Sequence, residues 1–331
     1  MRIRILTTVL IGGFCLIGAG CTTLVTNGTS VSNGTSQSPG MAPLPGQFAF
    51  QAKRGFLTAV GGGGRTTDVI HTDASNPRAW EKFRLWFNAN SGPYYAIQTV
   101  NGHFLTALNN GGQIANAIQS SSTTIVDEAL FNLVPETGAR VSFRAYAIQT
   151  VRGYFITAVG GGGKNIGETI HTDARTVGSW EEFNLFRCGD LGSGSTYGIE
   201  TGAPGAFFNI SNWIAAAGGG QNAGPNALVT NDLITSHLTF TLLRQPDGSY
   251  AMQTASGYFV TANGGGAPGQ GFRTDAAQIG SREKFTYVDN GDCTGYLKTY
   301  DGNYVSAPAN SITTVSDIAR ASRWRFWVYR L

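Results

Sequence analysis

The chain has 331 residues, a length typical of about two domains. Glycine accounts for 46 residues and proline for only 11, while 41% of the residues are hydrophobic, 11% aromatic and 13% charged. The low proline content excludes a Pro/Gly-rich disordered chain and a collagen-like chain. Glycine is about twice and charge about half as frequent as usual, and together with the aromatic residues this favours short strands joined by tight turns. The net charge of +3 is too small to indicate a nucleic-acid partner.

The first 20 residues are expected to form a signal peptide. Arg2 and Arg4 precede an apolar run over residues 5–18, and small residues lead up to Cys21. That run is shorter than the ~20 residues that span a bilayer. The segment resembles a bacterial lipobox, which implies a lipid on Cys21, although Gly18 stands where that pattern prefers leucine. Cleavage without lipidation is the alternative.

Residues 21–46 are expected to be the lipid anchor and a flexible tether. After Cys21 this segment has no charged residue and is rich in serine, threonine, asparagine, glycine and proline, as linkers are. We therefore expect an exported lipoprotein of the bacterial cell envelope that meets the membrane through its anchor alone. A secreted protein is the alternative.

Everything after residue 46 repeats, in six units. In each unit an alanine ends the second apolar run, and a phenylalanine follows it 19–25 residues later. The alanines are Ala59, Ala107, Ala158, Ala216, Ala262 and Ala307, and the phenylalanines are Phe83, Phe131, Phe183, Phe240, Phe285 and Phe326. Two anchors that recur at similar spacing through six units indicate one structural unit of about 45–50 residues.

Four short strands are predicted in each unit. The third unit shows them at residues 146–150, 154–158, 169–174 and 182–186, several with the alternation of a half-buried strand. Glycine in the first connection fits a hairpin turn, and the glycine run before the third strand predicts a mobile loop. No segment has the pattern of a long amphipathic helix.

Two all-β architectures suit this repeat: two tandem β-trefoils of three units each, or one six-bladed β-propeller. A glycine-rich break at residues 189–195 follows the third unit and divides the repeats into 47–191 and 196–331. Both parts have the size of a trefoil, and a propeller has no reason to break at its midpoint. Tandem trefoils are therefore the prediction, and the propeller is the alternative.

The repeat motifs resemble those of the fascin-like β-trefoil family, over residues 47–331. GHFLTA at residues 102–107 and GYFVTA at 257–262 match its second strand, and WEKF at 80–83 and WEEF at 180–183 match its fourth. Family members bundle actin in eukaryotic cytoplasm or form bacterial modules that often accompany glycoside hydrolases. For an exported chain the resemblance implies the second role, carbohydrate binding. A protein-binding adhesion or scaffold module is the alternative.

Cys188 and Cys293 are the two cysteines that remain in the repeats. In an exported protein one disulfide between them is expected as readily as two buried thiols, and their spacing does not decide between these alternatives.

A TDA motif recurs in three units and suggests ligand-binding residues. It contains Asp73, Asp173 and Asp275, and His71 and His171 precede the first two. The carboxylates are read either as a ring that accepts pairs of sugar hydroxyls or as caps of turn amides. His71 with Asp73 offers only two ligands, where tetrahedral zinc takes four, so no metal site is expected.

Aromatic residues provide a second set of candidates. Trp80, Trp180 and Trp324 recur near the anchor phenylalanine. They are read either as flat surfaces that stack on a pyranose ring or as core residues, and their fixed place in the repeat favours the core. Phe207, Phe208 and Trp213 belong to an insertion in the fourth unit and are expected either to bind a partner or to pack against the first trefoil.

The sequence predicts neither catalysis nor a cofactor. It contains no nucleophile-elbow, zinc-protease, phosphate-loop or CxxC motif. Glu81, Glu128, Glu181 and Glu283 recur symmetrically, which does not suit a unique acid and base pair. We therefore expect a non-catalytic protein whose partner is a glycan or polysaccharide, or alternatively an envelope or host surface protein.

Overall fold

The computed structural model describes residues 40–90, 92–136, 145–165, 169–202, 212–230, 235–308 and 311–331. Within these ranges the regular structure is β-strand and short 3-10 turn, without α-helix, and no helix there is long and apolar enough to cross a membrane. The expected signal peptide, Cys21 and most of the tether lie outside the described residues.

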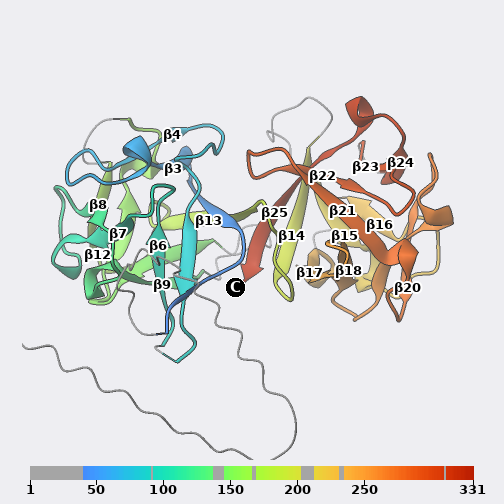
Figure 1. Cartoon of the computed structure of the whole chain (residues 1–331), viewed down its shortest axis with the longest axis horizontal. Helices are drawn as coiled ribbons and strands as arrows, with labels where there is room; N and C mark the ends of the chain where they lie inside the picture. The colour runs from blue at the N-terminus through green and yellow to red at the C-terminus, as the bar shows by residue number, and fades with distance from the viewer. Residues whose placement is uncertain are drawn as a thin grey trace, which may run out of the picture. The chain divides into compact units, whose positions relative to one another are not determined.

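Six strands of the first three units close into a barrel (Figure 1). They are β2 (Gln47–Ala52), β5 (Arg84–Phe87), β6 (Tyr94–Gln98), β9 (Leu130–Pro135), β10 (Tyr146–Thr150) and β13 (Glu182–Cys188). Each pairs antiparallel with the next, and β13 returns to β2. The contact between β2 and β5 is the bridge from Phe48 to Phe83.

The other two strands of each unit form a hairpin beside this barrel. The hairpins are β3 (Gly55–Ala59) with β4 (Ile70–Ala74), β7 (Phe104–Ala107) with β8 (Ile118–Ser122), and β11 (Phe155–Ala158) with β12 (Ile170–Ala174). Three units that each give two strands to a barrel and two to a hairpin make a β-trefoil.

The last three units repeat this arrangement, in the yellow to red part of Figure 1. The barrel strands are β14 (Thr196–Gly202), β17 (Thr239–Arg244), β18 (Tyr250–Thr254), β21 (Lys284–Asp289), β22 (Gly295–Lys298) and β25 (Arg323–Arg330), and β25 closes onto β14. The hairpins are β15 (Asn212–Ala216) with β16 (Leu228–Thr230), β19 (Phe259–Ala262) with β20 (Phe272–Ala276), and β23 (Tyr304–Ser306) with β24 (Thr313–Val315). The predicted tandem trefoils are confirmed, and the propeller alternative is wrong.

Short 3-10 turns occupy two recurring places. One set follows the second strand of a unit: η1 (Val60–Gly62), η2 (Leu108–Asn110), η4 (Val159–Gly161), η5 (Ala217–Gly219) and η7 (Asn263–Gly265). The other precedes the fourth strand: η3 (Asp127–Ala129), η6 (Thr235–His237), η8 (Ser281–Glu283) and η9 (Ile318–Arg320).

The anchor residues of the repeat are core residues. All six alanines and all six phenylalanines are at most 2% exposed. Because every unit contributes the same positions to the interior, a change of side-chain volume there would leave a cavity or a clash in a close-packed core. This packing constraint explains why the two anchors repeat.

The glycine runs are fixed turns and not the mobile loops that the sequence suggests. The Gly163 N–H donates to Thr72 O over 2.8 Å, and the Thr72 N–H donates to Lys164 O over 2.7 Å. Units one and two make the same exchange with Ser120 and Thr172. Each loop of the first trefoil thus holds the third strand of another unit, and the three exchanges form a closed ring.

One glycine in each of these loops is required by geometry. Gly63 has φ +105 and ψ −174, a region that only glycine occupies readily. A methyl group built on it would lie 2.3 Å from Thr99 Oγ1. The loop can therefore lie against the first strand of the next unit only because this side chain is absent.

The first trefoil begins earlier than the sequence suggests. The tether is expected to extend to Gly46, but β1 (Ala42–Pro43) pairs with β5, and the Leu44 N–H donates to Leu85 O. Met41 is buried and packs in the cluster that contains Trp86. Residues 41–44 therefore belong to the fold, because β1 pairs with β5 and Met41 is buried in the cluster of Trp86.

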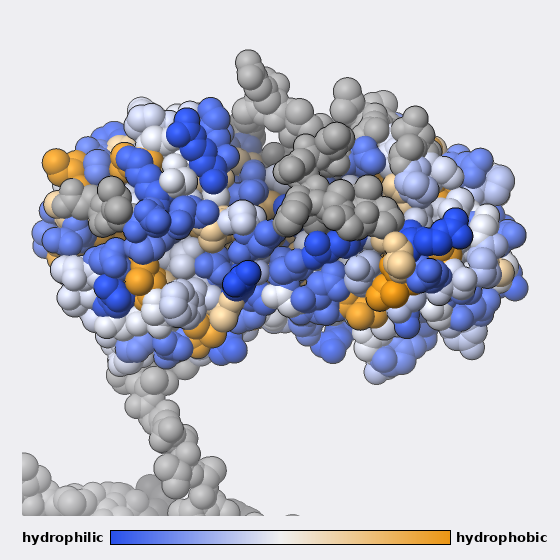
Figure 2. Space-filling view, turned by 90° about the horizontal axis from the view of Figure 1, so that it is seen from above, coloured by the Kyte–Doolittle hydropathy of each residue, from blue (hydrophilic) through white to orange (hydrophobic). Residues whose placement is uncertain are grey.

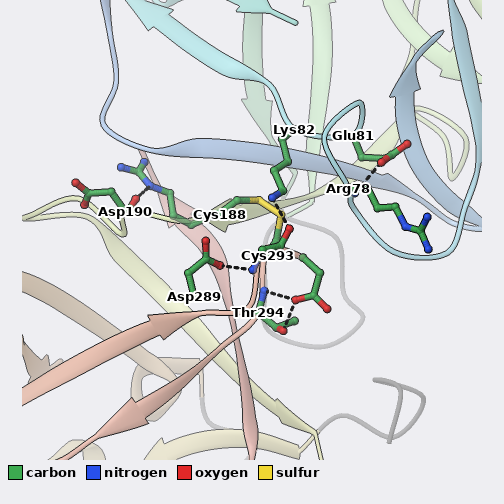
Figure 3. Close-up of a disulfide and its surroundings, with 11 residues drawn as sticks. Arg78, Glu81, Lys82, Cys188, Asp190, Asp289, Cys293 and Thr294 are labelled. Carbon is green, nitrogen blue, oxygen red and sulfur yellow. Dashed lines mark hydrogen bonds between the residues drawn. A yellow bond between two sulfur atoms is a disulfide. The ribbon is translucent and has the colours of Figure 1, made fainter. Parts of the chain in front are cut away.

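The two trefoils are joined by a strand pair and a disulfide. In the ladder between β13 and β25, Phe186 lies opposite Trp327 and Arg187 opposite Phe326. Cys188 and Cys293 form the disulfide. Of the two alternatives for these cysteines, the disulfide is therefore present and the pair of free thiols is not. Around the disulfide, the Lys82 ammonium donates to Gly291 O (Figure 3).

The glycine-rich segment at 189–195 packs against the second trefoil. Asp190 accepts hydrogen bonds from the Gly192 N–H over 2.8 Å and the Tyr250 hydroxyl over 2.9 Å, and it pairs with Arg244. Burial favours a higher pKa for Asp190, but these hydrogen bonds and the charges of Arg244 and Arg187 outweigh it and hold the pKa below its usual value. Burial and the Asp190 carboxylate raise the pKa of Tyr250 to about 12.

Candidate functional site

The recurring glutamates of the fourth strands serve the fold. Glu181 Oε1 accepts the Thr157 hydroxyl over 2.7 Å, and Oε2 accepts the Gly178 N–H over 2.8 Å. Glu81 and Glu283 make the same two kinds of bond. Each buried carboxylate therefore ties the turn before the fourth strand to the second strand.

Trp80 and Trp180 are exposed, and the expectation that they are core residues is wrong. Their exposed fractions are 49% and 47%, whereas Trp324 is 1% exposed and is a core residue as expected. Their backbones are held by the second strand of the unit: Trp80 O accepts the Ala59 N–H, and Trp180 O accepts the Ala158 N–H. The first trefoil thus presents two indoles at equivalent places.

The repeat itself contained the signal for this exposure. Three residues before the anchor phenylalanine, the other four units have a polar residue: Glu128, His237, Arg282 and Arg323. Such residues are rarely buried without a partner. Aligning the six units at this position indicates a surface site, so the two tryptophans there stand out as exposed apolar residues.

The Trp180 indole lies beside the glycine loop of its own unit. A methyl group built on Gly161 would lie 3.6 Å from Trp180 Cδ1 and 3.4 Å from Lys53 Cβ. Arg54 and Lys164 pack on the same loop, against Gly163 and Gly160. Lys53 and Arg54 come from the turn after β2, so this surface combines two units.

The equivalent surface near Trp80 has different neighbours. There the glycine loop meets Val100 and Asn101, which replace Lys53 and Arg54. Asn101 Nδ2 donates to Gly61 O over 3.0 Å. Arg65 replaces Lys164 and pairs with Asp68 over 3.1 Å. The two indoles therefore share a position but not an electrostatic environment.

The TDA aspartates do not form a ring. Asp73 and Asp173 lie on β4 and β12 of the first trefoil, where the third equivalent residue is Ser121, and Asp275 lies on β20 of the second. Within the described ranges, their side chains cap no turn amide. Asp173 lies 3.9 Å from His171 and Asp275 lies 3.8 Å from Arg273. Both readings of these residues therefore lack support in the geometry.

His71 bonds to a residue outside the motif. Its Nε2 lies 2.8 Å from Asp68 Oδ1, and Asp68 also accepts from Arg65. Among the residues that the structure describes, no three histidine, cysteine, aspartate or glutamate side chains gather where they could hold a metal ion.

Trp213 packs against the interface between the trefoils. Its ring lies 5.1 Å from that of Trp327, which lies 4.5 Å from Phe186 of the first trefoil. Of the two roles considered for this insertion, the geometry of Trp213 agrees with packing. Phe207 and Phe208 lie outside the described residues.

Two hollows in the first trefoil are too small to enclose a sugar ring. One, of about 30 Å³, lies where β4, β8 and β12 begin and is lined by Asp68, Asn116 and Thr169 among others. The other, of about 120 Å³, lies beside Val100 and Arg84. Sites that enclose small molecules usually measure about 300–1,000 Å³. The face in Figure 2 likewise carries small, separate apolar patches on a polar surface. The exposed indoles are therefore candidates for shallow binding.

No model of a known protein family matches the sequence, and no curated protein matches it. Among solved structures, a mosquitocidal holotoxin is similar at 11% identity with a TM-score of 0.36, over 85% of this chain and 34% of the holotoxin. This chain thus spans about a third of that protein. The designed three-fold symmetric protein ThreeFoil is similar at 14% identity (TM-score 0.34; 40% of this chain, 97% of ThreeFoil).

SeviL, solved bound to the asialo-GM1 saccharide, is similar at 10% identity (TM-score 0.32; 41% of this chain, 98% of SeviL). The trefoil assignment rests on the strand pairing described above and not on these distant similarities.

Proposed function

We propose that this chain is a non-catalytic carbohydrate-binding protein with fascin-like β-trefoils. The observation that carries the proposal is the pair of half-exposed indoles, Trp80 and Trp180, at equivalent positions of the first trefoil. An indole offers a flat apolar face and an N–H donor, which together suit the apolar face and hydroxyl rim of a pyranose ring.

Each site is shallow, so binding at one site is weak. Both indoles lie on one trefoil whose loops are fixed by hydrogen bonds between units. A polysaccharide that reaches both sites gains affinity because its second contact is intramolecular. We therefore expect long glycans to bind better than monosaccharides.

The absence of catalysis is part of the proposal. Its support is that the buried glutamates Glu81, Glu181 and Glu283 have both carboxylate oxygens engaged in holding the fold. A carboxylate committed to two internal donors is a poor general acid or base, since that role requires contact with the reacting group.

We also propose that the protein is exported and held in the bacterial envelope by a lipid on Cys21. The support is the segment from Arg2 to Cys21 and the uncharged residues after it. Labelled palmitate should enter the wild-type chain and not the Cys21→Ser variant. Secretion of an unlabelled wild-type protein would refute the anchor.

A glycan array with the full chain tests the binding function. Polysaccharides should retain the wild type, and the Trp80→Ala/Trp180→Ala double variant should lose at least about tenfold in affinity. The control is the Ile114→Ala/Ile318→Ala variant, which removes two other exposed apolar side chains and should bind as the wild type does. Retention on envelope or host surface proteins without any glycan binding would favour the adhesion alternative.

A further inference from the structure

We propose that the Trp180 site binds an acidic saccharide, one that carries a carboxylate, while the Trp80 site binds a neutral one. This inference rests on the proposed carbohydrate-binding function and specifies its ligand. It starts from the difference between two surfaces that the repeat makes equivalent.

Three basic side chains accompany the Trp180 indole. Lys53 and Arg54 are exposed, Lys164 is half-exposed, and all three pack on the glycine loop that the indole flanks. Within the described part of the chain, none of the three side chains pairs with a carboxylate. The site therefore has three basic side chains without an ion pair among the described residues, in a chain whose net charge is only +3.

The loop that carries these groups is rigid. The Arg54 N–H donates to Gly161 O over 3.0 Å, which fixes the turn of Lys53 and Arg54 to the loop. The Lys164 backbone is held by Thr72, through the Thr72 N–H and the Thr72 hydroxyl. These bonds hold the backbone of Arg54, Gly161 and Lys164 in place before a ligand arrives, so binding at these residues requires mainly side-chain ordering.

The chemistry of the ligand follows from these groups. A pyranose on the indole face places its substituents around the ring edge, where lysine and arginine donors can reach a carboxylate. Hydrogen bonds between such ionised groups are about twice as strong as neutral ones. Around Trp80 the same places hold Val100 and Asn101, and Arg65 is already paired with Asp68. The His103 imidazole lies beside Gly64 of that loop, so that surface offers an anion one imidazole in place of two lysines and an arginine.

The test compares two polysaccharides with one backbone: polygalacturonate and its fully methyl-esterified form. Full-length wild type should bind polygalacturonate about tenfold more tightly at low salt, and added salt should weaken this preference. The Lys53→Gln/Arg54→Gln/Lys164→Gln variant should lose the preference. The Arg152→Gln/Arg282→Gln/Arg320→Gln variant removes the same net charge elsewhere and should keep it.

The outcomes separate this inference from the proposed function. Equal binding of both polymers by the wild type, with loss in the Trp80→Ala/Trp180→Ala variant, would overturn the acidic ligand and keep carbohydrate binding. Failure to bind any glycan would overturn both. Binding to phosphatidylserine vesicles through Lys53, Arg54 and Lys164, without binding to polygalacturonate, would overturn the saccharide and indicate a lipid surface. Circular dichroism of each variant verifies that it is folded.

Discussion

Phe186 and Trp327 lie opposite each other in the ladder between β13 and β25, and their rings meet edge to face at 4.5 Å. One belongs to the first trefoil and the other to the second. Phe56, Ala49 and the disulfide cysteines complete a buried cluster around them. The two trefoils therefore share a core. A substitution that destabilises this cluster should weaken the contact between the trefoils.

Truncation of Trp327 should destabilise the protein strongly. Its Nε1 donates to Glu200 Oε2 over 2.7 Å, and Glu200 is buried. Trp327→Ala therefore leaves a cavity, and it removes the indole N–H that donates to the buried Glu200 carboxylate. We expect a loss of about 2–4 kcal/mol in the free energy of unfolding. Urea denaturation measures it. Trp80→Ala, which truncates an exposed indole, should cost less than about 1 kcal/mol, and equal losses would contradict the shared core.

Reduction of the disulfide should lower stability without separating the trefoils. Cys188 and Cys293 are 105 residues apart in the sequence, and a crosslink of such a long loop contributes about 2–4 kcal/mol, largely by restricting the unfolded chain. Urea denaturation with and without dithiothreitol measures this loss. Small-angle scattering should give the same radius of gyration in both states, because the strand pair remains.

The Cys188→Ala/Cys293→Ala variant is the control, because dithiothreitol should not change its unfolding. An increase in the radius of the reduced wild type would show that the disulfide alone holds the trefoils together.

The fold was predictable from the sequence because its core repeats. Ala59 and Phe83 occupy buried positions that every unit must fill in the same way, so their spacing indicates the architecture. The interface between the trefoils was not predictable in this way. Phe186 and Trp327 contact each other once in the molecule, so the repeat contains no second copy of their contact.

The core was wrongly preferred over the surface for Trp80 and Trp180 for a local reason. Whether Trp180 points into the barrel or out of it depends on the turn before β13, which Glu181 holds through Gly178. The WExF motif by itself gives the residue types but not this direction, which the polar residues at the same position of the other four units indicate. The sequence did not indicate the basic cluster, because Lys53 and Lys164 are 111 positions apart and lie on the same loop only through the contact between units.

Removal of a buried glutamate should show that it holds the fold. Glu181→Ala leaves the Thr157 hydroxyl and the Gly178 N–H without their acceptor, and we expect a loss of about 1–3 kcal/mol. Glu181→Gln keeps one carbonyl oxygen and should lose less. The control is Glu182→Ala, an exposed neighbour, which should stay within about 0.5 kcal/mol of the wild type. A Glu181→Ala variant as stable as the control would contradict the assignment.

Two glycines of one loop should respond differently to alanine. Both have positive φ, but a methyl group on Gly61 meets nothing within 4 Å, whereas one on Gly63 lies 2.3 Å from Thr99 Oγ1. Gly61→Ala should cost about 1 kcal/mol from backbone strain alone. Gly63→Ala should cost at least about 2 kcal/mol more, because it adds a clash and a less accessible backbone region. Thermal unfolding of the two variants measures the difference. Similar losses of stability would show that the loop backbone shifts to accommodate the methyl group on residue 63.

Acid should weaken the segment between the trefoils through Asp190. The pKa of this carboxyl is lower in the folded protein than its ordinary value of about 3.9, so the folded state favours the ionised form. Its contribution to stability is therefore present above the ordinary value and is lost as the pH falls through the lower, folded value. Urea denaturation of the wild type at pH 6 and pH 3 should show a decrease in the free energy of unfolding.

The Asp190→Asn variant isolates this effect. It keeps an oxygen acceptor for Tyr250 but no longer titrates, so its decrease between pH 6 and pH 3 should be smaller than that of the wild type. Asp317→Asn is a matched control, because Asp317 also accepts a backbone N–H, that of Ala319, but lies away from the segment. The Asp317→Asn control should lose as much stability in acid as the wild type does. If Asp190→Asn loses as much as well, the acid sensitivity arises at other carboxylates and protonation of Asp190 does not destabilise the segment.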